Sequence, residues 1–412
     1  MSTDHPSSES LLRHPSYPLF WYARVAAGFA LQMLAVAVGW QIYELTGSAL
    51  DLGLVGLAQF VPALVFVLIA GPVADRYDRR KVAWIAQAAQ ALAASVLALG
   101  TYGGWLSPGL IFAMVFIIGA GRAFEHPSVQ TLLPNIVSPA LLPRAVAASS
   151  SATQTAFITG PAIGGFLYAL SPTAVYVLCA LLWISAGFLV VRIAIEYTAG
   201  KREPLTFESF FGGIAFIRRN PIVLGAISLD LFAVLLGGAT ALLPIYARDI
   251  FETGPWGLGL LRAAPAFGAL AMALVLSRWP ITRRVGRAMF IGVAGFGVAT
   301  VVFAVSTSFV LSLAALAALG AADMVSVVIR QTLVQLHTPD AMRGRVYSVN
   351  TLFIGTSNQL GDFRAGLAAH AFGTVPSVLI GGIGTLLVVL VCIRAFPPLY
   401  KADRFAPEHG AK

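Results

Sequence analysis

Four acidic side chains interrupt the long apolar runs of this sequence, and they carry its most evident chemistry. They are Glu125, Asp230, Asp323 and Asp362. A carboxylate in an apolar environment is costly in its charged form, so it can take up and release a proton as its surroundings change. Asp323 and Asp230 fall near the middle of their runs at a helical rise of about 1.5 Å per residue. We therefore predict proton transfer at these residues, with Asp323 first and Asp230 second.

A structural role is the alternative for each of these carboxylates, because buried charges in membrane proteins are usually paired. Basic residues in the same runs supply candidate partners, namely Arg24, Arg122, Arg262, Arg330 and Arg364. Asp362 could pair with Arg262, and Asp323 could simply hydrogen-bond to polar neighbours. The sequence leaves proton transfer and structural pairing open at all four positions.

The chain around these residues is hydrophobic almost throughout. Of its 412 residues, 58% are hydrophobic and only 11% are charged, and the mean hydropathy is +0.82. This composition is far from that of a soluble domain and predicts an all-α integral membrane protein. A helix needs about 20 residues to cross a bilayer, so the length allows roughly twelve transmembrane helices. We expect spans at 18–43, 52–74, 82–103, 109–127, 145–170, 173–195, 221–247, 257–277, 288–306, 309–336, 345–371 and 374–396.

Basic residues indicate the orientation of these spans, because Lys and Arg are retained on the cytoplasmic side during insertion. Most of the 27 Lys and Arg residues fall in alternate loops and tails, whereas the opposite loops contain only Arg248. Both termini are therefore predicted to be cytoplasmic. The net charge of +9 then reflects topology and anionic lipid headgroups rather than nucleic acid.

The densest charge lies in "AGPVADRYDRRKVAW", residues 70–84, in the predicted loop between the second and third spans. An ordinary positively charged cytoplasmic loop is one interpretation. The stretch also resembles the G-x-x-x-D-R-x-G-R-R/K loop signature of the major facilitator superfamily, which occupies the same place. The matching residues are Gly71, Asp75, Arg76, Arg79 and Arg80. Asp78 replaces the usual second glycine.

This resemblance implies a cytoplasmic gate. In the superfamily the loop stabilises the outward-open state, in which the cytoplasmic side is closed. Asp75 would be the central acceptor of that network, with Arg122 or Arg144 as its local partner.

Internal repetition agrees with the resemblance. The stretch "QTLLPNIVSPALLPRAVA" (130–147) is echoed by "QTLVQLHTPDAMRGRVYS" (331–348), about half the chain later. Two pseudo-symmetric six-helix halves follow, at 17–195 and 220–397, with the substrate site near the midplane between them as in the superfamily. A cytoplasmic linker at 196–219 joins them, and its later part could form a helix on the inner membrane surface. Cytoplasmic tails at 1–16 and 398–412 complete the expected organisation.

Two further stretches bear on the kind of transporter. The first, "TGPAIGG" (159–165), resembles a signature in the fifth span of family antiporters through Gly160, Pro161, Gly164 and Gly165. A generic packing motif is the alternative, because proline removes a backbone donor and glycine lets a neighbouring helix approach. The second, "SNQLGDFRAG" (357–366), resembles the bacterial drug and siderophore exporter branch, which includes enterobactin-exporter-like and macrolide-efflux-like proteins.

Uncharged polar residues within the spans are candidates for the wall of a substrate cavity. They are Gln32, Gln59, Gln154, Thr155, Asn350 and Asn358. Hydrogen bonds between helices are the alternative for most of them. None of these residues identifies the cargo.

Other chemistries find little support. The sequence has no G-x-x-x-x-G-K-[ST] phosphate loop, and its six histidines and two cysteines lack metal-ligand spacing. We therefore predict no enzyme activity, no metal or other cofactor and no nucleic-acid partner. The sequence favours a monomeric secondary transporter of the bacterial inner membrane that exports an amphipathic small molecule, a drug or siderophore, by proton-coupled alternating access. A facilitator or importer with the same fold is the alternative, because fold does not dictate direction.

Overall fold

The computed structural model describes residue 11, residues 14–194 and residues 207–405, apart from a few side chains that include that of Asp75. Most of the predicted N-terminal tail, the first part of the 196–219 linker and the end of the C-terminal tail lie outside these ranges. Within them the regular structure is entirely helical, which confirms the predicted all-α class.

The long helices follow one another with short connections. They are α1 (Ser16–Thr46), α2 (Ala49–Arg76), α3 (Arg79–Gly103), α4 (Pro108–Gln130), α5 (Leu142–Leu170), α6 (Pro172–Val191), α8 (Pro221–Gly237), α10 (Gly254–Arg278), α11 (Val285–Val305), α12 (Phe309–Leu336), α13 (Asp340–Phe372) and α14 (Thr374–Ala395). Ten segments of the described chain are long and apolar enough to cross a membrane. The two long helices outside this set are α5 and α13, which carry four of the six polar residues predicted for the cavity wall, namely Gln154, Thr155, Asn350 and Asn358.

Several of these helices begin where a polar side chain caps the first turn and proline follows. Ser171 precedes Pro172 of α6 and accepts a hydrogen bond from the amide of Ala174 at 3.3 Å. Asn220 precedes Pro221 of α8 and accepts from the amides of Ile222 and Val223, both at 3.2 Å. Such starts satisfy amide donors that no helical carbonyl can reach. They explain why the spans begin at these positions.

The chain divides into two compact units. Unit 1 combines Met1–Val38 with Ala58–Pro204, and unit 2 combines Gly39–Leu57 with Leu205–Lys412. In this division the segment 39–57, which connects α1 to α2, belongs to unit 2. Its Gly53 lies so close to α13 that a Cβ there would be 3.2 Å from the Cα of Gly366. The pseudo-symmetric halves at 17–195 and 220–397 stay a prediction.

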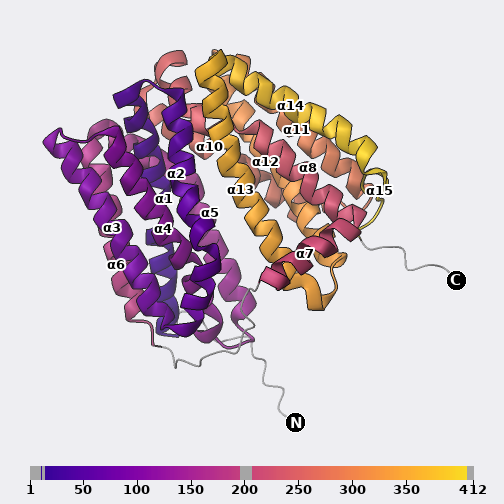
Figure 1. Cartoon of the computed structure of the whole chain (residues 1–412), viewed down its shortest axis with the longest axis horizontal. Coiled ribbons are helices and arrows are strands. Elements are labelled where there is room, and N and C mark those ends of the chain that lie inside the picture. Colours follow the sequence, from indigo (N-terminus) through magenta and orange to yellow (C-terminus); the bar gives the residue numbers. More distant parts are fainter. Residues whose placement is uncertain (1–10, 12–13, 195–206, 406–412) are drawn as a thin grey trace, which may run out of the picture. The chain divides into compact units, whose positions relative to one another are not determined.

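Unit 1 contains α3 through α6 and most of α1 and α2. Figure 1 shows α3 and α6 side by side in this unit, and α3 also packs against α4. One core cluster gathers buried residues of α1, α4, α5 and α6, including Tyr17, Phe20, Val129, Ala145 and Val190. These helices therefore share one apolar core.

Unit 2 is built around α12, which packs against both α10 and α11, while α11 also packs against α14 (Figure 1). A Cβ at Gly268 would lie 1.8 Å from the carbonyl oxygen of Ala317, and a Cβ at Gly320 would lie 1.9 Å from that of Pro265. The α10 and α12 backbones thus touch at two reciprocal glycines. Small residues permit such close packing where lipid supplies no hydrophobic drive for association.

The predicted span 221–247 is less regular than expected. Helix α8 ends at Gly237, and three short pieces follow: η3 (Thr240–Leu242), α9 (Leu243–Ile245) and the π-helical η4 (Tyr246–Ile250). Two consecutive glycines and Pro244 interrupt the helical ladder here. Tyr246 is nevertheless fully buried, and its hydroxyl donates to the carbonyl of Ala304 at 3.1 Å.

The later part of the linker forms a helix, as predicted. This helix, α7 (Phe207–Arg219), packs against α8 and α13 within unit 2. Its place on the inner membrane surface stays a prediction. After α14, α15 (Pro397–Tyr400) contributes buried Leu399 to a core cluster that includes residues of α8, α11 and α12.

Candidate functional site

A polar cavity of about 120 Å³ lies within unit 1 among α1, α3, α4, α5 and α6. We call it the Glu125 cavity. Its lining residues are Ala23, Arg24, Ala27, Gly28, Leu31, Gln87, Gln90, Arg122, Glu125, His126, Val129, Thr153, Phe157 and Val190. Charged, amide and apolar groups therefore meet at one place inside a bundle of membrane-spanning helices.

Helical spacing places the polar groups on this wall. Gln87 and Gln90 are three residues apart on α3, and Arg122, Glu125 and His126 are spaced by three and four on α4. Residues with these spacings share one helix face. Two facing helices thus present amides and charges to each other.

Two buried amides hold the Glu125 carboxylate. The Nε2 atoms of Gln87 and Gln90 donate to its two oxygens at 2.9 and 2.8 Å. Both glutamine side chains belong to residues only 1% exposed. Neutral donors, rather than a basic partner, therefore satisfy this carboxylate.

The basic groups of the cavity stay apart from any carboxylate. Arg24 donates to the hydroxyl of Thr153 at 3.2 Å, and within the described ranges neither Arg24 nor Arg122 forms an ion pair. Both lie near enough to Glu125 for longer-range attraction, and His126 interacts electrostatically with both. The cavity therefore combines one amide-bound carboxylate with two guanidinium groups that lack a counter-ion contact.

Unit 2 contains a second polar cluster, the Asp230 network, with the opposite arrangement. Asp230 of α8 and Arg330 of α12 form an ion pair at 3.3 Å, and Arg330 donates to the side-chain oxygen of Asn350 on α13 at 3.2 Å. These three residues are 6%, 3% and 7% exposed. Charge is thus neutralised directly between three packed helices, and the structural alternative considered for Asp230 has a specific partner.

Asp323 lies beside this network. Asp323, Ser326 and Arg330 are spaced by three and four residues along one face of α12, and a small cavity of about 10 Å³ is lined by Asp230, Asp323 and Ser326 among others. The Ser326 hydroxyl is buried and has no hydrogen-bond partner in the part of the chain that the structure describes. The space suits about one water molecule. Asp323 therefore has little room for a cargo but shares its surroundings with a buried ion pair.

Asp362, the remaining acidic candidate, lies near the end of α8. The amide of Ala241 hydrogen-bonds to its carboxylate. Arg364, two residues later, donates to the carbonyls of Leu235 and Leu236 at 3.2 and 2.5 Å. The pair considered between Asp362 and Arg262 is not formed among the described residues, and the Arg262 Nε is buried without a hydrogen-bond partner.

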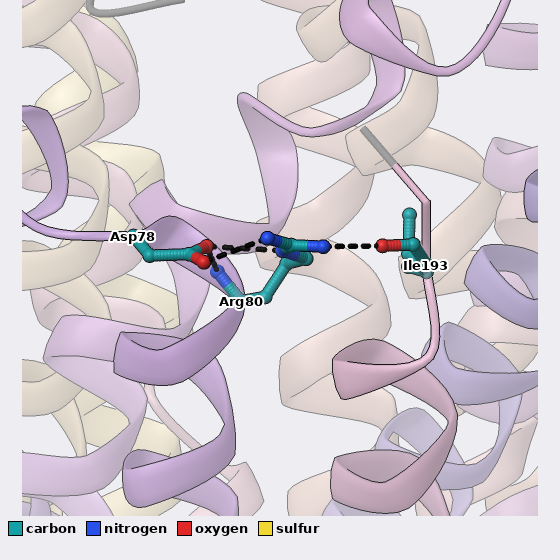
Figure 2. A network of polar contacts seen from close by, with 3 residues as sticks. All are labelled: Asp78, Arg80 and Ile193. Atoms are coloured by element: carbon teal, nitrogen blue, oxygen red, sulfur yellow. Dashed lines mark hydrogen bonds and ion pairs between the residues drawn. The ribbon is translucent and has the colours of Figure 1, made fainter. Parts of the chain in front are cut away.

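The loop between α2 and α3 forms the contacts shown in Figure 2. Arg80 donates to both carboxylate oxygens of Asp78, at 3.1 and 2.8 Å, and to the carbonyl of Ile193 at 2.8 Å. The Asp78 carboxylate also accepts from the amide of Arg80, so Asp78 caps α3 with an ordinary φ of −59°. Hydrogen bonds from Arg80 lower the pKa of Asp78. Asp78 thus acts as a helix cap at the position where the family signature has its second glycine.

The other residues of the predicted gate are distributed more widely. Arg79 donates to the carbonyls of Ala74 and Thr131 at 3.2 and 3.4 Å, which ties the loop to the end of α4. Arg76 and Arg144 are exposed, Gly71 is half-buried, and the Asp75 side chain lies outside the described part. The structure places Arg122 in the Glu125 cavity.

The glycine-proline motif of α5 packs against α1. Pro161 and Gly165 are buried, a Cβ at Gly160 would lie 2.7 Å from the Cβ of Gln32, and one at Gly164 would lie 2.8 Å from the Cα of Met33. This geometry supports the packing interpretation. The antiporter interpretation stays a prediction.

The polar residues predicted for the cavity wall have varied surroundings. Thr155 and Asn358 donate to carbonyls one turn earlier in their own helices, at 2.9 and 2.8 Å. Gln154 is half-buried, and the backbone of Gln59 closely faces α4 at Gly119. Asn350 belongs to the Asp230 network. None of the six lines the Glu125 cavity.

Sequence reasoning overlooked several residues that line this cavity. Gln87, Gln90, His126 and Thr153 had no assigned role, although Arg24, Arg122 and Glu125 were singled out as charges. Two glutamines three residues apart inside an apolar run were a usable signal, since buried amides in a membrane need partners. Their partner, Glu125, lies 38 and 35 positions away in sequence.

Known proteins resemble this chain over nearly its whole length. A family model described as transmembrane secretion effector matches residues 7–410. The enterobactin exporter EntS of Escherichia coli is 28% identical over 412 residues, which cover 98% of this chain and 97% of that protein. EntS of Shigella boydii is 28% identical over 413 residues, which cover 96% and 97%.

Solved structures show the same fold. The nucleoside transporter NupG has a TM-score of 0.72 and 14% identity, covering 92% of this chain and 99% of NupG. A bacterial homologue of the iron transporter ferroportin, in an inward-facing state, has a TM-score of 0.70 and 17% identity, covering 96% and 100%. Together with the family match and the apolar helices, these similarities confirm the predicted superfamily and exclude the enzyme class. The chain belongs to the transmembrane secretion effector family of the major facilitator superfamily, as a multi-pass membrane transporter of small molecules.

Proposed function

We propose that this chain is a proton-coupled exporter of an amphipathic small molecule, a drug or siderophore, in the bacterial inner membrane. Its similarity to the enterobactin exporters supports export as the direction and a siderophore-like molecule as the cargo. The Glu125 cavity is the observation that carries the proposal. It brings charged and amide groups together with apolar and aromatic side chains, a combination that suits the polar end of an amphipathic molecule.

Transport would proceed by alternating access, with the halves 17–195 and 220–397 as its moving bodies. Each half would rock as a body while the site opens to one side and then to the other. The predicted gate loop, with Asp75, Arg76, Arg79 and Arg80, would hold the cytoplasmic side closed in the outward-open state. Basic residues in alternate loops support cytoplasmic termini, and a monomer would be sufficient for this mechanism.

Proton coupling requires a carboxylate that can exchange a proton as access alternates. Asp323 and Glu125 suit this role better than Asp230, because Asp230 is held in an ion pair with Arg330. Glu125 faces the Glu125 cavity, which is larger than the cavity beside Asp323, and its protonation would change the charge that the cargo meets. Asp323 lies beside the ion pair, where protonation would change the charge of the Asp230 network.

Proteoliposomes with imposed pH gradients test the proposal. A panel of siderophores, macrolides and cationic dyes is supplied, and uphill accumulation of at least one compound, driven by an inward proton gradient, is the expected result. Asp323→Asn and Glu125→Gln keep size and hydrogen bonding but cannot release a proton. At least one of them should abolish uphill export while sparing downhill exchange.

Asp340→Asn is the matched control, because Asp340 is an exposed residue at the start of α13. It should transport like the unaltered chain. If the unaltered chain transports at a rate that does not depend on the pH gradient, the protein is a facilitator instead. Phosphatase fusions to the C-terminus that are active outside the cell would overturn the orientation.

A further inference from the structure

The Glu125 cavity carries an excess of positive charge. It contains two guanidinium groups and one carboxylate, and the carboxylate oxygens already accept hydrogen bonds from Gln87 and Gln90. Within the described ranges Arg24 donates a single hydrogen bond, to Thr153, and Arg122 donates none. Most of the donors of Arg24 and Arg122 are therefore available to a ligand.

A guanidinium group without a counter-ion is costly where it is removed from water, because surroundings of low polarity solvate its charge poorly. Arg24 is half-buried, and Arg122 is exposed to the space that a ligand would enter. The Asp230 network shows how this chain compensates such a group elsewhere, with a carboxylate at 3.3 Å from Arg330. In the Glu125 cavity the carboxylate of Glu125 instead accepts hydrogen bonds from the side-chain amides of Gln87 and Gln90. Arg24 and Arg122 therefore have no carboxylate in ion-pair contact among the residues that the structure describes.

The walls of the cavity define the rest of the ligand. Leu31, Phe157, Val129 and Val190 are apolar and come from α1, α5, α4 and α6. A ligand that fits both parts has an anionic group and an apolar or aromatic body. Carboxylate, sulfonate and phosphate oxygens match the planar donor fork of arginine.

We infer that the Glu125 cavity selects amphipathic anions and binds their charged group through Arg24 and Arg122. This inference rests on the proposed export function and specifies the charge of the cargo. Two guanidinium groups against one carboxylate disfavour a cationic molecule, and a neutral molecule lacks the charge–charge attraction that an anion gains. The negative charge of Glu125 repels an anionic ligand. The hydrogen bonds from Gln87 and Gln90 to the Glu125 carboxylate reduce this repulsion.

Two dyes that differ by one sulfonate provide the test. 8-Anilinonaphthalene-1-sulfonate is an amphipathic anion, and N-phenyl-1-naphthylamine is the same aromatic body without the charge. Binding of both is measured by fluorescence to the full chain in phosphatidylcholine nanodiscs, with empty nanodiscs subtracted. The sulfonate should bind at least about tenfold more tightly than the neutral dye, which corresponds to about 1.4 kcal/mol.

Arg24→Gln and Arg122→Gln should each weaken the sulfonate about tenfold and leave the neutral dye unchanged. Arg278→Gln, at the exposed end of α10, is the matched control and should change neither. Glu125→Gln removes the opposing charge and should tighten sulfonate binding severalfold. A gain of this kind cannot arise from unfolding.

Equal binding of both dyes, or weaker sulfonate binding in Glu125→Gln, would overturn the inference. An anionic lipid headgroup shares the same chemistry, so the measurement is repeated with phosphatidylglycerol in the nanodiscs. Sulfonate binding that persists supports a soluble cargo, and its loss would identify the lipid as occupant and refute the inference. Gradient-driven export of a cationic dye that is insensitive to both arginine substitutions would refute the inference while leaving the proposed function intact. Sulfonate binding without any gradient-driven transport would support the inference and refute the proposed function.

Discussion

The two polar clusters of this transporter use the same side-chain chemistry in opposite ways. In the Asp230 network of unit 2, a carboxylate and a guanidinium group are paired at 3.3 Å between helices, with room for about one water. In the Glu125 cavity of unit 1, the carboxylate is bound by amides, and two guanidinium groups lie unpaired around a cavity of about 120 Å³.

This difference separates charges that hold helices together from charges that can act on a ligand. In a direct buried ion pair each charge is compensated by the other, so neither side chain gains much by binding a third group. An amide-bound carboxylate leaves its neighbouring cations unsatisfied. A charged residue within a span does not by itself indicate a role in transport. The group that contacts this charged residue is more informative.

Breaking the Asp230 network should have the largest effect on stability. Asp230→Asn leaves the buried Arg330 guanidinium without its ion-pair partner, which we expect to destabilise the protein by about 3–5 kcal/mol. Thermal unfolding of the purified protein in detergent measures the loss. The double variant Asp230→Asn, Arg330→Gln removes both charges and should recover part of it. A single variant as stable as the unaltered chain would show that the pair does not hold α8 to α12.

Removing an amide from the Glu125 cavity should have an intermediate effect. Gln90→Leu deletes the 2.8 Å hydrogen bond to the carboxylate, and hydrogen bonds to charged groups contribute about 1.5–3 kcal/mol. The loss should shrink when Glu125→Gln is introduced first, because the acceptor is then uncharged. Gln154→Leu on α5 is the matched control and should cost less. Equal losses in both backgrounds would mean that Gln90 acts by packing alone.

The loop pair of Asp78 and Arg80 should have the smallest effect, because both side chains are about one quarter exposed, at 23% and 25%. Asp78→Asn keeps a capping oxygen but loses the charge, so we expect a loss of about 0.2–1 kcal/mol. Folding lowers the pKa of Asp78, so the pair stabilises the protein above the unfolded value of about 3.9. That stability should fade as the pH falls through the lower folded value. Unfolding curves of both proteins from pH 6 downward test this, and a constant difference would contradict the charge assignment.

Much of the fold was predictable because membrane insertion leaves a strong record in the sequence. Apolar runs gave the long helices, and the helical later part of the 196–219 linker was also expected. The irregular segment after Gly237 was not, since π-helical turns around Pro244 depend on what packs against them, such as Ala304 near Tyr246. The site was predicted less well. Charges inside spans were visible, but their partners were not.

The sequence by itself determined the membrane class, the family and which charges lie within long apolar runs, because each follows from composition, hydrophobic length or a local motif. Only the tertiary structure decided that Asp230 meets Arg330 and that Glu125 meets Gln87 and Gln90. These partners lie on different helices and far apart along the chain. Helical periodicity gives the face on which a side chain lies, whereas helix packing decides which other face it meets. In surroundings of low polarity, the contact between two helix faces decides whether a charge is neutralised by another side chain or remains available to a ligand.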